Sequence, residues 1–349
     1  MAAAHGRRQR RAYIGSFTAE GGPGVLVAAV DGDSGALTLL GSAADVPDPS
    51  YLALSTDGET LYAVSENARG AVAAYRVTDD RPALTGPPVP VGAGPTHLCV
   101  LDGHVLTADH AGGSVTAVPL LADGTLAPAA SGTLRHPGPR ADGERRPHAH
   151  QVVPASAGDR FLAVDLGTDT VRVCALEDGV PVVRSETRLR PGSGPRHLAL
   201  AADAPDAPDA VYVHVLNELA PTVTVCRWNA PDGPLEPLQE VPVLPSAPDG
   251  DAYPSGIVVS PDGRHVWTAT RGTDVLSVLA VEGPSLRLVA TVPCGGRWPR
   301  ALAHAAGTLY VANQCSGDIT WFTVDPVTGV PVLAGSVAVP AASCVVLGA

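Results

Sequence analysis

Arginine, histidine and carboxylate residues gather beside a short proline-led motif that recurs along the chain. Some stand within a few residues after the proline: His97, His148, His150, Arg196, His197 and Arg300. Others stand where the next apolar segment ends: Glu66, Asp109, His110, Glu218 and Arg271. Guanidinium forks suit carboxylates and phosphates, while imidazole and carboxylate groups transfer protons. These residue types indicate a site for a small anionic substrate, provided that the fold brings the segments together.

The recurring motif is a proline, one or two small or polar residues and an apolar run. It occurs seven times, at Pro49, Pro95, Pro147, Pro195, Pro254, Pro299 and Pro340, so that successive prolines are 41 to 59 residues apart by subtraction. Periods of this size are typical of four-stranded propeller blades. Tight turns such as Asp57-Gly58 and Asp262-Gly263 follow the motif and predict a hairpin to a second strand. A third and a weaker fourth strand precede the next proline.

The two ends of the chain determine the number of blades. Three apolar segments, AYIGSFT, GVLVAAVD and ALTLLGS, come before the first proline motif, whereas the last motif at Pro340 has no strand after it. One C-terminal strand and three N-terminal strands complete a blade, which closes the ring and removes exposed sheet edges. We therefore predict an all-β, seven-bladed propeller over residues 12–349. The basic residues 1–11 are expected to form a disordered tail.

The hairpin geometry predicts where the reactive residues meet. Because the first two strands of a blade are antiparallel, the start of one and the end of the other lie at the same end of the propeller. If the proline strand is innermost, both sets of residues line one mouth of the central channel. An alternative role for Asn67, Asp109, Asp165 and Asn313 is to tie adjacent blades by hydrogen bonds to the backbone.

Composition excludes several classes of function. The formal net charge is −12 and the chain contains no lysine, which gives no support for nucleic-acid binding. No apolar run approaches the roughly 20 residues of a membrane span. The start MAAAHGRRQRR carries twin arginines, but no apolar segment follows as in an export signal. The six cysteines show no pairing pattern, so we expect reduced thiols, a cytoplasmic location and a monomer or weak homo-oligomer.

The sequence offers little that would hold a metal or a cofactor. His148 and His150 are two residues apart on a strand, hence on one face, and could chelate zinc. The chain has no HExxH motif, however, and the nearby acids belong to other blades. There is also no G-x-S-x-G nucleophile motif and no dinucleotide-binding glycine motif that opens a helix. We therefore expect no metal and no cofactor.

Several blocks give the chain a family resemblance. They are YIGSFT at Tyr13, DPSYLALSTDGETLYAVSEN at Asp48, GAGPTH at Gly92, RRPHAHQV at Arg145, VDLGTD at Val164, GSGPRHLAL at Gly192, LNEL at Leu216 and TRGTD at Thr270. The chain resembles the seven-bladed propeller lactonases, which include 6-phosphogluconolactonases and carboxymuconate-lactonizing enzymes. The resemblance implies that His148, Arg196, Glu218 and Arg271 are the active-site residues. Two blocks depart from the family pattern: Asp109-His110 replaces a common Asn-Tyr, and CGGRWPRALA is unusual.

The leading hypothesis is hydrolysis of the lactone of a small anionic sugar acid. Arg196 and Arg271 would bind the anionic group or the oxyanion that develops on the lactone carbonyl. Either His148 or Glu218 would act as general base. The alternatives are a muconate-type cycloisomerase and a non-catalytic propeller that binds a ligand or protein. A metal-dependent gluconolactonase of the six-bladed regucalcin type is disfavoured by the count of seven repeats.

Overall fold

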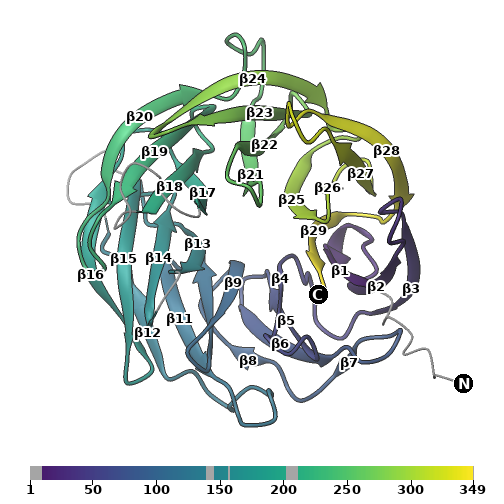
Figure 1. Ribbon diagram of the computed structural model, residues 1–349. Helices are drawn as coiled ribbons and strands as arrows, with labels where there is room; N and C mark the ends of the chain where they lie inside the picture. Colours follow the sequence, from purple (N-terminus) through teal and green to yellow (C-terminus); the bar gives the residue numbers. More distant parts are fainter. Residues whose placement is uncertain (1–9, 139–144, 156–157, 202–210, 349) are drawn as a thin grey trace, which may run out of the picture.

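The chain folds into seven small antiparallel sheets arranged as blades in a ring around a common centre (Figure 1). The computed structural model describes residues 10–138, 145–155, 158–201 and 211–348. The seven-bladed propeller predicted from the proline motif is thus confirmed. Residues 1–9 of the predicted N-terminal tail lie outside the described residues, as do residues 202–210, whereas Arg11, the last residue of the predicted tail, already belongs to the first strand, Arg11–Ser16.

Each blade contains four or five strands, which pair in chain order from the innermost strand outward, except that the last two strands of blade 1 both pair with its third strand. Blade 1 has β4 (Leu52–Leu54), β5 (Thr60–Ser65), β6 (Ala71–Arg76), β7 (Ala83–Leu84) and β8 (Val89–Pro90). Blade 2 has β9 (Pro95–Leu101), β10 (His104–Asp109), β11 (Ser114–Pro119) and β12 (Gly132–Arg135). Blade 3 has β13 (Ala149–Pro154), β14 (Arg160–Asp165), β15 (Thr170–Glu177) and β16 (Val180–Arg188). Blade 4 has β17 (Pro195–Ala201), β18 (Val211–Asn217), β19 (Thr222–Trp228) and β20 (Glu236–Pro242).

The remaining blades have the same order. Blade 5 has β21 (Tyr253–Val259), β22 (His265–Arg271), β23 (Val275–Glu282) and β24 (Ser285–Pro293). Blade 6 has β25 (Pro299–Ala305), β26 (Thr308–Asn313), β27 (Asp318–Val324) and β28 (Pro331–Ala338). Blade 7 joins β29 (Ala342–Leu347) to β1 (Arg11–Ser16), β2 (Val25–Val30) and β3 (Leu37–Ala43). A short 3₁₀ helix, η1 (Thr18–Glu20), follows β1.

Blade 7 closes the ring by the predicted pairing of the two ends of the chain. Its innermost strand β29 is antiparallel to β1, with Ile14 opposite Val345 and Tyr13 opposite Val346. In Figure 1 the yellow C-terminal strand lies beside the purple N-terminal strands. Both terminal strands, β1 and β29, are therefore hydrogen-bonded within one sheet.

Apolar residues pack between neighbouring blades. Ile14 and Leu26 of blade 7 belong to the same buried cluster as Tyr310 and Trp321 of blade 6, and similar clusters join other neighbouring blades. The inner strands are apolar along most of their length because both of their faces are covered by adjacent blades. The part of the chain that is described contains no helix long and apolar enough to cross a membrane.

A repeated backbone contact defines two positions at the same end of every blade. We call lead position the residue at or shortly before the start of the innermost strand, and rim position the residue opposite it at the end of the second strand. In most blades the rim N–H donates to the lead carbonyl, as in Leu166 to His148 at 3.0 Å and Glu218 to Gly194 at 2.7 Å. In blade 5 the strand register pairs Tyr253 with Arg271. From blade 1 to blade 7 the lead residues are Asp48, Gly94, His148, Gly194, Tyr253, Trp298 and Ala341, and the rim residues are Glu66, His110, Leu166, Glu218, Arg271, Gln314 and Phe17.

Candidate active site

One carboxylate and two guanidiniums form the centre of the site. Arg196 is the second residue of β17, while Glu218 and Arg271 are the rim residues of blades 4 and 5. Oε2 of Glu218 lies 2.8 Å from Nε of Arg196 and 2.8 Å from Nη2 of Arg271. The Arg196 side chain is only 3% exposed and that of Arg271 9%, against 18% for Glu218. Three residues that the sequence places near one mouth therefore share one buried ion-pair cluster.

The two guanidiniums are held in place by backbone carbonyls. Nη1 of Arg196 donates to the carbonyl of Ser255, and Nε of Arg271 donates to that of Tyr253 at 3.2 Å. Burial and the charge of Arg271 lower the pKa of Arg196 to about 9, although Glu218 acts in the opposite direction. Arg196 is thus still charged at neutral pH. Nε of Arg196 and Nη2 of Arg271 are buried and face Oε2 of Glu218 as ion-pair partners, without the alignment of a full hydrogen bond.

A second ion pair lies across blades 6 and 1. Nη2 of Arg300 is 3.3 Å from both carboxylate oxygens of Glu66, and the hydroxyl of Ser50 donates to the same carboxylate. The Arg300 guanidinium lies 4.7 Å from the ring centre of Phe17 and donates to Gln314 at 3.4 Å. The Arg300 side chain is 17% exposed, and its contacts are longer than those of Arg196. The Arg300 guanidinium is therefore more accessible than that of Arg196.

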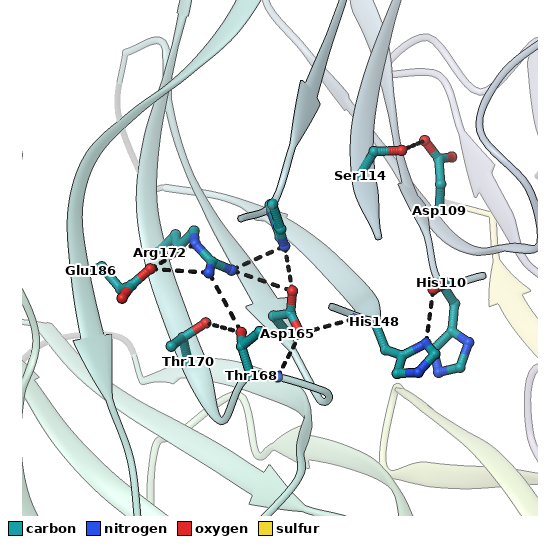
Figure 2. Close-up of polar contacts among 10 residues, drawn as sticks. Asp109, His110, Ser114, His148, Asp165, Thr168, Thr170, Arg172 and Glu186 are labelled. Carbon is teal, nitrogen blue, oxygen red and sulfur yellow. Dashed lines mark hydrogen bonds and ion pairs between the residues drawn. The ribbon is translucent and has the colours of Figure 1, made fainter. Parts of the chain in front are cut away.

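His148 is oriented by its neighbour His110. Nδ1 of His148 is 3.1 Å from the carbonyl oxygen of His110, and the two rings stack with centres 4.5 Å apart (Figure 2). A carbonyl only accepts, so Nδ1 of His148 carries the proton and Nε2 keeps a lone pair. The main-chain N–H of His148 donates to Asp165 at 2.9 Å, which fixes the backbone as well. The arrangement leaves Nε2 as a potential proton acceptor.

Three further histidines of the predicted site, His97, His150 and His197, form a row of rings on the innermost strands that continues to His110. The ring centres of His97 and His197 are 5.5 Å apart, those of His197 and His150 are 5.2 Å apart, and those of His150 and His110 are 5.4 Å apart. Tyr51 stacks on His97 at 4.0 Å. Burial lowers the pKa of His97 to about 3, and burial together with the charge of Arg196 lowers the pKa values of His150 and His197. All three rings are neutral at physiological pH and offer hydrogen-bonding nitrogens without adding positive charge.

The structure does not bring Asp109 to this group. Its side chain is fully buried and accepts hydrogen bonds from Thr107 at 2.7 Å, Ser114 at 3.0 Å and Thr116 at 2.7 Å, all within blade 2. Figure 2 shows its carboxylate directed to Ser114 while the His110 ring stacks on His148. Burial raises the pKa of Asp109 to about 6. Its contacts make Asp109 a structural residue of its blade.

Other residues at the ends of second strands behave like Asp109. Asn217 and Asn313 donate to hydroxyls of their own third strands. Asp165 lies 2.5 Å from Nδ1 of His136 and within 3.4 Å of Arg172, so it joins the end of blade 2 to blade 3 (Figure 2). The alternative role of tying adjacent blades thus applies to Asp165, whose partner is a side chain, whereas Asp109 and Asn313 bind side chains of their own blades.

Sequence reasoning missed the aromatic residues of the site. Tyr51, Phe17, Tyr253 and Trp298 contact the predicted histidines or guanidiniums, yet none is ionisable near neutral pH. The residue directly before each proline is the signal that could have found Tyr253 and Trp298. Among the described residues no group of three or more histidine, cysteine or acidic side chains is placed to hold a metal ion.

Fold and site together define a class: a seven-bladed propeller with a cluster of arginine, glutamate and histidine at the channel mouth. The family model described as "Lactonase, 7-bladed beta-propeller" matches residues 11–347. The chain therefore belongs to the seven-bladed β-propeller lactonase family.

Relatives with assigned names agree with this membership. A 6-phosphogluconolactonase of Bacillus subtilis is 31% identical over 344 residues, covering 95% of this chain and 97% of the relative. A crystal structure of a candidate 6-phosphogluconolactonase from Bacteroides fragilis has a TM-score of 0.87 at 26% identity and covers both chains fully. The periplasmic gluconolactonase of Pseudomonas aeruginosa has a TM-score of 0.87 at 27% identity, covering 97% of this chain and 99% of that one.

Proposed function

We propose that this chain hydrolyses the lactone of a small anionic sugar acid, with 6-phosphogluconolactone as the leading substrate. The observation that carries the proposal is the Glu218 carboxylate held 2.8 Å from a nitrogen of both Arg196 and Arg271 in a largely buried cluster. The Bacillus subtilis relative named as a 6-phosphogluconolactonase supports this substrate.

The side chains suggest a division of roles. A water oxygen attacks the lactone carbonyl carbon and loses its proton to Nε2 of His148. The negative charge that develops on the carbonyl oxygen is stabilised by Arg196 and Arg271. When the ring C–O bond breaks, His148 returns its proton to the departing alkoxide, which gives the open-chain hydroxy acid. Nothing else is consumed besides water.

Glu218 fits a positioning role better than that of a base. Its Oε2 lies 2.8 Å from a nitrogen of each of two guanidiniums, so the carboxylate bridges the two arginines and aligns them. His148, in contrast, has its tautomer fixed by the His110 carbonyl. We therefore assign the general base to His148, and the alignment of both arginines to Glu218.

The remaining residues would bind the rest of the substrate. Arg300, which is accessible and only loosely paired with Glu66, suits the phosphate or other anionic end. The neutral rings of His97, His150 and His197 suit hydroxyl groups, which both donate and accept hydrogen bonds. His110 acts through its carbonyl on His148.

The direct test is hydrolysis of 6-phosphogluconolactone and of unphosphorylated gluconolactone, followed by NMR against the spontaneous rate. We expect turnover of the phosphorylated lactone, a loss of about 100-fold or more in kcat for His148→Gln, and a similar loss for Arg196→Ala. His104→Gln, at the opposite end of β10, is the matched control and should keep wild-type activity. Full lactonase activity in both Arg196→Ala and Glu218→Gln would overturn the assignment.

We also propose a cytoplasmic location and a monomeric or weakly associated state. All six cysteines are free, and five of them are buried, which suits a reducing compartment. Cell fractionation and light scattering of the purified protein test the two points. Recovery from the periplasm, where the Pseudomonas aeruginosa relative resides, would contradict the first.

A further inference from the structure

Trp298 has an unusual backbone conformation for a large side chain. Its φ is +62°, in the left-handed region, at a lead position where blades 2 and 4 have Gly94 and Gly194 with φ of +57° and +61°. Glycine adopts this region without strain, whereas a bulky residue there is an outlier. The main chain of Trp298 is fixed from both sides: its N–H donates to Asp274 at 2.8 Å, and its carbonyl accepts from Gln314 at 3.1 Å.

The indole ring lies at the channel mouth beside the ion-pair cluster. Its centre is 5.5 Å from Cζ of Arg271 and 6.2 Å from the ring centre of Tyr253, which is itself 6.0 Å from the same guanidinium. Tyr253 is the lead residue of the adjacent blade 5, and its ring meets the indole in an edge-to-face contact, with 61° between the two planes. The lead position of blade 3 holds His148, whose ring stacks on the rim residue His110. The side chains at the lead positions of blades 3, 5 and 6 thus contact rim residues of the candidate site, His110 or Arg271.

Burial separates Trp298 from the other tryptophans. Trp228, Trp267 and Trp321 are 7%, 1% and 8% exposed and belong to the clusters between blades. Trp298 is half-buried instead. The same left-handed lead position holds glycine in blades 2 and 4 and the smaller residues Asp48 and Ala341 in blades 1 and 7, with φ of +49° and +53°, so the backbone contacts do not need a large ring. A large ring at this position therefore indicates a function for its exposed face.

We propose that Tyr253 and Trp298 form an aromatic wall that packs against the C–H face of the substrate's ring and selects for cyclic over open-chain ligands. This inference rests on the proposed function and adds to it a binding surface for the uncharged part of the lactone. The face of an aromatic ring is electron-rich and attracts polarised C–H groups, while the flat ring adds apolar contact area. Arg271, between the wall and Glu218, places the lactone carbonyl next to the same surface. Opening of the ring removes the stacked face, which favours release of the product.

The test compares two anionic probes that differ in their ring. One is 1,5-anhydroglucitol 6-phosphate, a cyclic compound that cannot be hydrolysed, and the other is open-chain 6-phosphogluconate. Trp298→Gly removes the indole and relieves the left-handed strain, while Trp298→Phe keeps an aromatic face. Dissociation constants from calorimetry and thermal midpoints are measured for the wild type and both variants. Intrinsic fluorescence gives a second readout, because the other three tryptophans are buried.

We expect Trp298→Gly to weaken the cyclic probe about tenfold, or about 1.4 kcal/mol, and the open-chain probe less than twofold. Trp298→Phe should retain most of the affinity for the cyclic probe but lose the fluorescence change on binding. Equal weakening of both probes by Trp298→Gly would mean that the indole acts only through Arg271, and unchanged binding of both would remove it from the site. Either result overturns the aromatic wall and leaves the proposed function standing. If the wild-type protein binds neither probe, this result refutes the proposed function and therefore also the aromatic wall.

Discussion

Five histidines whose pKa values are strongly lowered by burial should make this propeller sensitive to mild acid. They are His97, His110, His150, His197 and His214, and burial lowers the pKa of each below 6.5, to about 3 for His97 and about 4 for His110 and His214. In the unfolded chain each would take up a proton near pH 6.5. Between the folded and unfolded pKa values the unfolded state binds more protons. The stabilisation is therefore complete above pH 6.5 and is lost as the pH falls below it.

The size of the effect follows from the same pKa differences. Between pH 6 and pH 5 each of these histidines lowers the free energy of unfolding by roughly 1 kcal/mol, so that five cost about 5 kcal/mol. Asp109 acts in the opposite direction, because burial raises its pKa to about 6 and its protonation in the folded state returns about 1 kcal/mol. The net loss of about 4 kcal/mol is a large part of the roughly 5–15 kcal/mol that stabilises a typical domain.

Urea unfolding followed by circular dichroism at pH 7, 6 and 5, at constant ionic strength, measures this loss. His214→Leu provides a matched variant away from the candidate site, since both ring nitrogens of His214 are buried without a partner. We expect this variant to be as stable as the wild type at pH 7 and to lose about 1 kcal/mol less between pH 6 and pH 5. An unfolding free energy that is the same at pH 6 and pH 5 would refute the reasoning. So would an unaltered acid sensitivity in His214→Leu.

Further expected outcomes concern individual charges. Glu218→Gln leaves two buried guanidiniums without their shared carboxylate and should lower the unfolding free energy by about 3 kcal/mol in urea titration; Glu236→Gln, in an exposed pair, should cost less than about 0.5 kcal/mol. Arg300→Gln should lower kcat/KM for the phosphorylated lactone about 10-fold to 100-fold and leave that for gluconolactone within about twofold, and an equal loss on both would exclude a phosphate contact. Asp165→Asn removes the charge that faces a buried histidine and arginine and should lower the thermal midpoint by several degrees. Prolonged dialysis against a chelator should leave hydrolysis unchanged, and a loss that zinc restores would contradict the expectation that the enzyme needs no metal.

The proline spacing predicted the blades and their closure because it reports the backbone period directly. The side chains were harder to place. Successive residues at the end of a second strand point in different directions, so Asp109 turns into its own blade, whereas His110 reaches the site. Both are polar, and composition does not distinguish them. Trp298 was not predicted for another reason. Its role depends on its left-handed backbone conformation and on its contact with Arg271 of the adjacent blade, neither of which the sequence indicates.

The pairing of β29 with β1 has a consequence for how the protein folds. Ile14 and Val345 come from opposite ends of the chain, so the ring can close only after nearly all of the chain has left the ribosome. Contacts so distant in sequence form slowly. Phe17, which follows β1, lies against Arg300 of blade 6, and Arg300 in turn reaches Glu66 of blade 1. The second ion pair thus spans the closing blade, and ligands that bind Arg300 and Glu66 together should favour the closed ring during refolding.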